Sequence, residues 1–400
     1  MPPLRITLLL CSAEILGLSG LATFAALLPF FLDTWAISHT QAGWLSAVYY
    51  IGYVLCAPLL TAVTDRFDAK KILLGSLLVG FLASVGFSFA ATGFWSAMVL
   101  RLLSGVSLAG IYMPGLKLLS DHVTGARQSR YVSFYTASFG FGAGLSYFLT
   151  GEISLIWGWR WAFVLAGLLN LAGLAVVWLL VPTGRTSGSG TIRLQAAHFA
   201  AVFANRRAMA YILGYAAHMW ELFSLRAWMV VFLDYSRHLQ AAAEGALSPT
   251  QVVALINVIG LPVSIGGNEL CRRFGRRRTL TWIMLTSFAL SLAVGFSAAL
   301  PYGIVVGIVL IYGVFVLGDS ASLTAGAVSH APAERRGATL AVHSTLGFGA
   351  AFLGPLGVGV VLDAFSARPG LGWGFSFVLM GGVCALGPLV LHRLLPADKP

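Results

Sequence analysis

Six charged side chains lie inside long apolar stretches of the chain, where an unpaired charge is costly. They are Glu14, Arg101, Lys117, Glu221, Arg226 and Asp319. A carboxylate in such surroundings can take up and release a proton, and an arginine can bind an anionic group. If the apolar stretches cross a membrane, each of these residues is a candidate functional residue. Lys117 stands near enough to the end of its stretch to reach the surface, which is the simpler explanation of its charge.

The segment from His218 to Trp228 holds the densest group of such residues. At 100° per residue, His218, Glu221 and Arg226 span roughly 140° of a helix surface, so they can share one face. We expect this face to bind a substrate; an internal ion pair that only holds the helix in place is the alternative. Aromatic side chains beside the charges suit an organic molecule with an apolar body. The expected substrate-binding residues are Arg226, Glu221, His218, Arg101, Trp220, Tyr53 and Asn257.

Acids and histidines in the same stretches could carry protons. An acid that is protonated in one state and ionised in another moves a proton, and histidine titrates near neutral pH. Permanent pairing with a basic neighbour is the alternative for Asp319, and packing is the alternative for His343. The expected proton-coupling residues are Glu14, Glu221, Asp319 and His343.

The composition indicates that the apolar stretches are membrane helices. Apolar residues make up 58% of the 400 residues and charged residues 10%, against roughly 25% charged in a soluble domain. Helices are expected because unpaired backbone groups are costly in lipid. The sequence therefore predicts an all-α polytopic membrane protein with twelve transmembrane helices. Their approximate spans are 6–32, 42–63, 71–91, 95–119, 130–151, 159–181, 208–233, 250–271, 279–299, 302–328, 337–362 and 373–395.

The two halves of the chain are similar to each other. Arg66-Phe67 recurs as Arg273-Phe274, and Glu14 recurs at the same offset as Glu221. We therefore expect two pseudo-symmetric six-helix bundles, an arrangement typical of secondary transporters. A Gly/Ser-rich stretch between helices six and seven supplies a flexible connection. The expected domains are residues 1–181 for the N-terminal bundle, 182–207 for the linker and 208–400 for the C-terminal bundle.

Most of the 25 lysine and arginine residues fall in alternate loops. This asymmetry predicts that both termini lie in the cytoplasm, with the chain in an inner membrane. The net charge of +11 follows from the same loops, so we expect no nucleic-acid partner. The four cysteines lack metal or redox spacing, and no nucleotide loop or nucleophile elbow occurs. We therefore expect a monomer without a cofactor, and not an enzyme.

Two motifs resemble those of a known family. The charged stretch after the second helix follows the pattern Gly-x-x-x-Asp-Arg-x-Gly-Arg-Lys/Arg at Asp65, Arg66 and Lys70, and it departs from that pattern at Thr61, Asp68 and Ala69. Helix four contains Arg101-x-x-x-Gly105-x-x-x-Ala109-Gly110. With twelve helices and a central inner loop, the chain resembles the major facilitator superfamily.

The resemblance implies a gate at the inner surface. In the family, the carboxylate matching Asp65 engages the start of helix eleven, where Arg335 and Arg336 stand here. A second contact joins an arginine of the motif to the acid matching Asp121; since Ala69 replaces that arginine, another cation of the motif would substitute. The alternative is that these charges only fix topology. The expected gating residues are Asp65, Arg66, Lys70, Asp121, Arg335 and Arg336.

The resemblance also implies that helices one, four, seven and ten line a central cavity. We expect a secondary active transporter that moves a small organic solute by alternating access, coupled to protons. Arg226 and Arg101 favour an organic anion. One alternative is a proton antiporter that exports amphipathic cations or drugs, recognised by the acids. The other is a non-transporting membrane sensor with the same fold.

Overall fold

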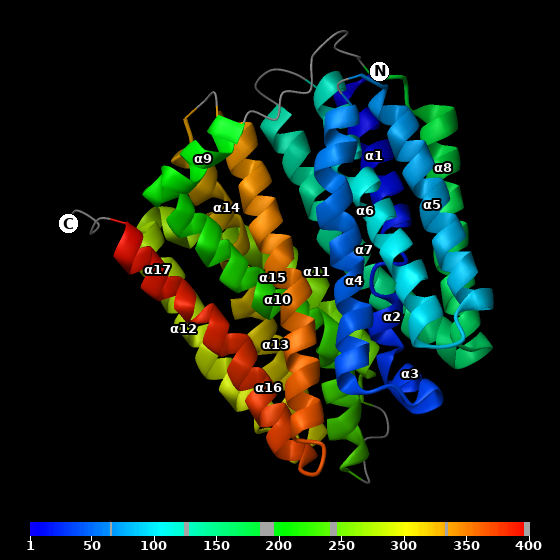
Figure 1. Cartoon of the computed structure of the whole chain (residues 1–400), viewed down its shortest axis with the longest axis vertical. Helices are drawn as coiled ribbons and strands as arrows, with labels where there is room; N and C mark the ends of the chain where they lie inside the picture. Colours follow the sequence, from blue (N-terminus) through cyan, green and yellow to red (C-terminus); the bar gives the residue numbers. More distant parts are fainter. Residues whose placement is uncertain (65, 124–127, 185–195, 241–245, 333–334, 396–400) are drawn as a thin grey trace. The chain divides into compact units, whose positions relative to one another are not determined.

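The computed structural model describes residues 1–64, 66–123, 128–184, 196–240, 246–332 and 335–395. All the regular elements in these ranges are helices (Figure 1). In chain order they are α1 (Pro3–Gly17), α2 (Thr23–Ala26), α3 (Leu28–Trp35), α4 (His39–Val63), α5 (Ala69–Ala90), α6 (Phe94–His122), α7 (Gln128–Trp157), α8 (Trp159–Leu180), α9 (Ala196–Ala204), α10 (Arg206–His238), α11 (Pro249–Phe274), α12 (Arg276–Gly295), α13 (Tyr302–Gly318), α14 (Ser320–Ser329), α15 (Arg336–Ala364), α16 (Pro369–Cys384) and α17 (Leu386–Leu394).

The helices confirm an all-α polytopic membrane protein. Within the described part of the chain, 10 helical spans are long and apolar enough to cross a membrane. The two other predicted crossings fall on the α1–α3 segment and on α10. The first is interrupted by turns, and the second carries the buried charges Glu221 and Arg226. The turns interrupt the first segment and the charges make the second less apolar, but both segments contain helices.

The chain forms two compact units. Unit 1 comprises residues 1–35 and 48–193, and unit 2 comprises residues 36–47 and 194–400. The first turns of α4 therefore belong to unit 2, and the rest of α4 belongs to unit 1. The reason lies in close contact with α15: a Cβ atom on Gly359 would stand 2.3 Å from the His39 carbonyl oxygen, and one on Gly43 would stand 2.8 Å from that of Pro355. Small residues permit such backbone approach between membrane helices.

Each unit has its own apolar core. In unit 1, α5 packs against α6 and α8, and α1 packs against α7 and α8. Leu77 and Tyr135 are among the buried residues there. In unit 2, α10 packs along α15 and also against α14, α16 and α17. Tyr211, Met284 and Leu323 belong to that core. Helix α10 is therefore central to unit 2, which is why its polar residues are buried.

The predicted helix 6–32 is broken in the structure. Residues Leu18–Ala22 form turns between α1 and α2. Ser146 of α7 satisfies the backbone there, because its hydroxyl accepts from the Ala22 N–H at 3.0 Å and donates to the Ser19 carbonyl at 2.7 Å. Irregular backbone in a membrane needs internal partners of this kind.

Two further predicted helices are interrupted. The span 302–328 divides into α13 and α14 at Asp319, beside a point where α11 and α13 touch: a Cβ atom on Gly267 would lie 1.8 Å from the Gly318 carbonyl oxygen. The span 373–395 divides into α16 and α17 at Ala385. There Pro388 has no N–H to donate to the carbonyl four residues earlier, so the helical ladder is interrupted.

Candidate functional site

Helix α10 carries the three polar residues that the sequence predicts on one helix face. Most of its circumference is covered by other helices of unit 2. His218, Glu221 and Arg226 are 0%, 1% and 8% exposed. Buried polar groups need partners inside the protein. Each of these three residues has a different one, so α10 carries three distinct sites.

His218 lies against Asp319, the single residue between α13 and α14. The imidazole Nδ1 is 2.7 Å from the carboxylate Oδ1, and both side chains are buried. The angles at this contact fall outside hydrogen-bond geometry. The contact is an ion pair when the imidazole is protonated. The structure therefore places an imidazole directly beside a buried carboxylate inside unit 2.

A row of aromatic rings leads from this pair to α15. Tyr215, one turn before His218 on α10, stacks on His218 with 5.7 Å between ring centroids and on His343 with 3.8 Å. The Nε2 atom of His343 lies 3.2 Å from the hydroxyl oxygen of Thr324 on α14. Titratable rings from α10 and α15 thus lie side by side next to Asp319.

Glu221 is held by hydroxyl groups. Its Oε1 atom accepts hydrogen bonds from Tyr312 on α13 at 2.9 Å and from Ser287 on α12 at 3.0 Å. These donors are hydroxyl groups, whereas the neighbour of Asp319 is an imidazole. The two acids of unit 2 therefore have chemically different surroundings, and either protonation state of Glu221 can keep hydrogen bonds to the hydroxyls.

Arg226 is bound by an amide. Its Nε and Nη2 atoms donate to Oδ1 of Asn257 on α11 at 3.1 and 2.9 Å, and its guanidinium lies 5.1 Å from the centre of the Phe223 ring. Asn257 is fixed in turn by its own bond to the Val253 carbonyl. The amide orients the guanidinium plane while the positive charge of the arginine is retained. This geometry is suited to recognising a planar anionic group.

Glu14 and Arg101 are predicted site residues that lie in unit 1. Glu14 on α1 is 1% exposed and accepts a hydrogen bond from the Ser138 hydroxyl of α7; its Oε1 has no hydrogen-bond partner among the described residues. The guanidinium of Arg101 on α6 lies 4.6 Å from the Tyr49 ring centre and 5.0 Å from that of Phe24. Desolvated cation–π contacts of this kind stabilise a buried charge. The structure thus shows how Arg101 is accommodated without reaching the surface.

The predicted set also includes two aromatic residues. The Trp220 ring packs 3.3 Å from the place that a Cβ atom of Gly357 on α15 would take, and its indole N–H has no hydrogen-bond partner in the described part of the chain. Tyr53 is 2% exposed, in the part of α4 that belongs to unit 1. Both positions are compatible with a binding surface and with packing.

The predicted gating residues that the structure describes lie at or beside helix ends. Asp65 is outside the described residues. The ammonium group of Lys70 donates to the Val181 carbonyl at 2.6 Å and to the Trp178 carbonyl at 3.0 Å, so it caps the end of α8. A cation at a helix C-terminus interacts favourably with the free carbonyl groups. Lys70 therefore connects α5 to α8 inside unit 1.

The remaining gating residues have separate surroundings. Asp121 pairs with Lys117, one turn earlier on α6, at 3.2 Å. Arg66 and Arg336 are exposed, and Arg335 is the N-cap residue of α15. In this conformation the lysine of α6, rather than Lys70, neutralises Asp121. The gating role of the set stays a prediction.

Several structural contacts were not anticipated from the sequence. Asp68 caps α5 through the Lys70 N–H and also accepts from the Gly184 N–H, each at 2.9 Å. Asp363, at the end of α15, binds the start of α4. Of these residues, only the contact of Tyr215 could have been inferred from the sequence, because an aromatic residue three positions before a histidine lies on the same helix face as that histidine.

Comparisons with known proteins agree with this architecture. The sequence matches the model of the Major Facilitator Superfamily over residues 10–355. It is 26% identical over 175 residues to Protein spinster homolog 3 of Danio rerio, which covers 43% of this chain and 35% of that protein. It is 30% identical over 162 residues to a gallate transporter of Pseudomonas putida, covering 40% and 36%. These alignments span only about a third of each relative.

A solved structure is similar over the whole chain. The crystal structure of a bacterial homolog of the human lysosomal transporter spinster, in an inward-facing and occupied conformation, aligns with a TM-score of 0.77. The alignment covers 99% of this chain and 98% of that one, at 14% sequence identity. At this identity the similarity establishes the fold alone.

Proposed function

The chain belongs to the Major Facilitator Superfamily, and on this premise we propose that it is a secondary active transporter of a small organic solute. Members of this family with similar sequences are transporters and not enzymes. The transport cycle would be alternating access, in which residues 1–181 rock against residues 208–400. In the proposed orientation both termini lie in the cytoplasm, as the basic loops favour. We also propose that the protein is a monomer in the inner membrane.

The observation that carries the proposal is the buried His218–Asp319 pair. Charged or titratable groups in a membrane bundle are costly and mark ion or substrate pathways. The His218 imidazole lies 2.7 Å from the Asp319 carboxylate, and the Tyr215 ring stacks on both His218 and His343. We propose that these groups, together with Glu221 and Glu14, couple transport to protons.

The substrate we propose is an organic anion. Arg226, oriented by Asn257, offers a fixed guanidinium inside unit 2. Phe223 supplies aromatic surface beside it, and Trp220 lies on the same helix. The similar protein from Pseudomonas putida is named for gallate, an aromatic carboxylate, which matches this combination of a cation with aromatic rings.

A second candidate is the export of amphipathic cations in exchange for protons. Glu14 favours it, because one oxygen of this buried carboxylate is left without a hydrogen-bond partner among the described residues. Such an oxygen could bind a cationic group or a proton in turn.

The test begins with thermal unfolding of the purified protein against organic anions and cations at two pH values, because a ligand of the native state raises Tm. The best binder is then measured by counterflow in proteoliposomes, with and without a pH gradient. We expect an aromatic carboxylate to bind, to exchange, and to accumulate when the gradient is applied. Exchange of cations only would support the second candidate, and no exchange of any bound solute would contradict transport.

A further inference from the structure

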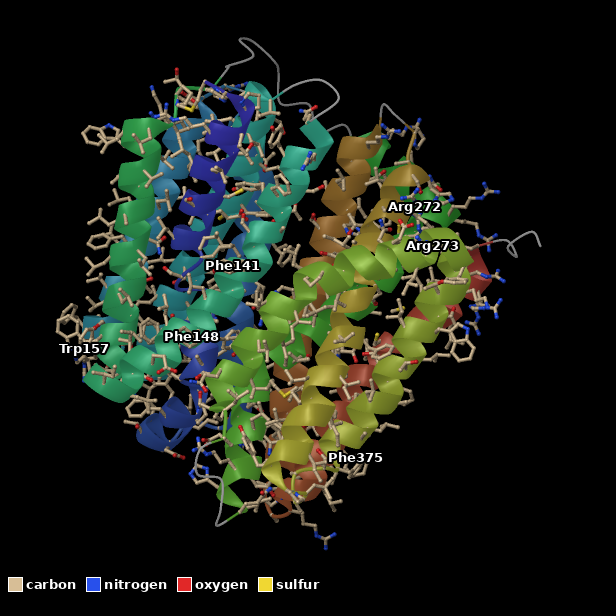
Figure 2. The ribbon with its side chains drawn as sticks, turned by 180° about the vertical axis from the view of Figure 1, so that it is seen from behind. Phe141, Phe148, Trp157, Arg272, Arg273 and Phe375 are labelled. Atoms are coloured by element: carbon tan, nitrogen blue, oxygen red, sulfur yellow. The ribbon has the colours of Figure 1, made fainter. Side chains whose placement is uncertain are left out.

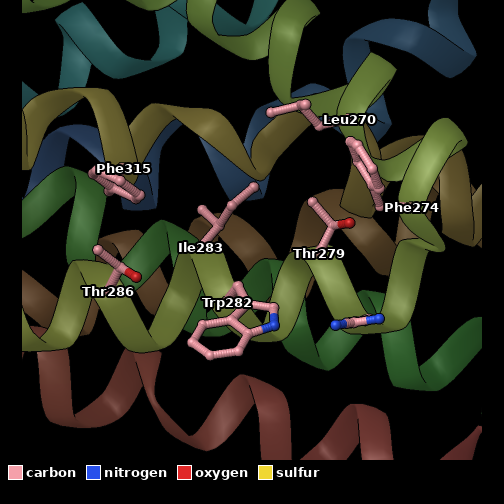
Figure 3. A pocket seen from close by; sticks show the side chains of 8 residues that line it. Leu270, Phe274, Thr279, Trp282, Ile283, Thr286 and Phe315 are labelled. Carbon is pink, nitrogen blue, oxygen red and sulfur yellow. The ribbon is translucent and has the colours of Figure 1, made fainter.

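We propose that unit 2 binds an anionic phospholipid in a groove on the exposed surface of its helices, at the junction of α11, α12 and α13. The groove has a volume of about 360 Å³. Leu270 and Phe274 come from the end of α11, Trp282 from the start of α12, and Phe315 from α13 (Figure 3). Arg278 also lines the groove, from the first turn of α12. The groove is therefore apolar along its length and basic at one end. This site is separate from the buried residues to which transport is assigned above.

The lining residues are spaced to follow a lipid from headgroup to acyl chain. Arg278, Trp282 and Thr286 occur at intervals of four residues, so they form one stripe along α12. At 1.5 Å per residue the stripe is about 12 Å long. Arg278 lies in the first turn of the helix, where a phosphate would be, and Thr286 lies two turns further into the apolar span.

The side chains that cover the groove are exposed. Trp282 is 64% exposed, Phe274 66% and Leu270 47%. All three belong to helices that are long and apolar enough to cross a membrane, so their exposed faces are available to lipid. Tryptophan one turn inside a basic helix end is typical of the headgroup level of a bilayer.

Arg278 differs from the other arginines in its cluster. Within the described part of the chain, it makes no hydrogen bond or ion pair and remains exposed. The arginines with partners inside the protein are Arg272 and Arg273 (both to Glu269), Arg276 (to the Ser329 hydroxyl) and Arg277 (to the Leu395 carbonyl). Arg272 and Arg273 are labelled at the end of α11 in Figure 2. The guanidinium of Arg278 is thus the one that matches a phosphate in the groove.

These features together favour a lipid over a soluble anion. A phosphate alone would use Arg278 but would leave the aromatic walls without a ligand. An uncharged lipid would cover the walls but would not use the guanidinium. Basic pockets between membrane helices bind anionic headgroups in this way.

The experiment measures lipid binding to the purified full chain in a neutral detergent, by native mass spectrometry and by Tm. Phosphatidylglycerol and diacylglycerol with identical chains are compared, and inorganic phosphate is a third ligand. We expect phosphatidylglycerol to bind and raise Tm, and the other two to do neither to the same extent. Equal effects of both lipids, or an equal effect of inorganic phosphate, would overturn the proposal.

Two variants localise the site. Arg278→Ala should weaken phosphatidylglycerol binding about fivefold, the effect of removing one arginine near an anionic headgroup. Arg272→Ala is the matched control, because this exposed arginine is already paired with Glu269. Exposed ion pairs contribute little free energy, so this variant should change phosphatidylglycerol binding less than twofold. Trp282→Ala should also weaken binding while leaving the charge unchanged. Equal losses in the two arginine variants, or wild-type binding by Arg278→Ala, would refute the site.

Discussion

Asp363 and His39 are joined at two points. Oδ1 of Asp363 accepts a hydrogen bond from the His39 backbone N–H at 2.9 Å, and it lies 2.9 Å from the imidazole Nδ1. The other oxygen accepts from the Thr40 N–H at 2.8 Å. A carboxylate at the end of α15 thus caps the start of α4, where free N–H groups favour negative charge. The contact lies within unit 2, whereas α4 continues into unit 1 after residue 47.

Asp363→Ala should loosen the first turn of α4, because two backbone N–H groups lose their acceptor. Loss of a helix cap typically costs about 1 kcal/mol. Hydrogen exchange of the peptide 36–47 should become faster, and Asp363→Asn should have a smaller effect because its oxygen can still accept. Asp33→Ala, which removes an exposed acid on α3, is the control. Unchanged exchange in Asp363→Ala would show that the cap does not hold the helix.

Asp319→Asn should separate transport from the pH gradient. The amide cannot exchange a proton at neutral pH, so solute exchange at equal pH should persist while accumulation driven by the gradient should be lost. Substituting His218 by Gln should give the same result, since we propose that the two contacting side chains act together in coupling. Both are measured in proteoliposomes.

The control for this pair is Glu269→Gln, an acid at the exposed end of α11 that pairs only with arginines. It should retain accumulation. His343→Gln tests whether the ring row is part of the proton path: loss of coupling would include His343, and retention would leave it as a packing residue. Full gradient-driven accumulation in both Asp319→Asn and His218→Gln would exclude the pair from coupling.

Arg226→Ala should raise the KM for an organic anion by about tenfold or more, since a hydrogen bond to a charged group contributes roughly 1.5–3 kcal/mol. Arg226→Lys keeps the charge but loses the two-atom contact with Asn257, so its KM should lie between those of the wild type and Arg226→Ala. Asn257→Ala should also be intermediate, because the guanidinium loses its orientation. An unchanged KM in Arg226→Ala would move the anion site elsewhere.

Gly267→Ala should destabilise unit 2. The new Cβ atom would stand 1.8 Å from the Gly318 carbonyl oxygen, so α11 and α13 must separate next to Asp319. Overpacking of this kind typically costs about 1–3 kcal/mol. Gly266→Ala is a matched control, because nothing lies within 4 Å of the Cβ position there. Thermal unfolding in detergent should show a lower Tm for Gly267→Ala only; equal Tm values would contradict the close helix contact.

The fold was largely accessible from the sequence because apolar run length and loop charge report directly on membrane helices. The interruptions inside the helices could not be predicted from the sequence. Leu18–Ala22 contains no proline, and its backbone is satisfied by Ser146 from a helix more than a hundred residues away. Local propensity cannot report such a partner, so the sequence predicted one continuous helix at 6–32.

The sequence singled out candidate residues, whose roles stay predictions, but it did not indicate their contacts. Helical spacing correctly put polar residues on α10, yet their partners come from α11, α12, α13 and the α13–α14 break. Asp363 had no signal at all, since an acid at the end of an apolar run also occurs where nothing is bound. Tertiary contacts of this kind arise only in the folded chain.

The interruption after α1 and the buried charges of α10 also bear on how the chain enters a membrane during its synthesis. Neither segment is among the spans that are apolar and regular enough to cross by themselves within the described residues. A nascent helix presented alone to lipid lacks the bonds that Ser146 or Asn257 later provide, and a charge at its centre costs about 2.5–3.5 kcal/mol. The α1–α3 segment and α10 are also the first crossings of the two halves of the chain. The stable insertion of each segment therefore depends on helices that the ribosome has yet to make.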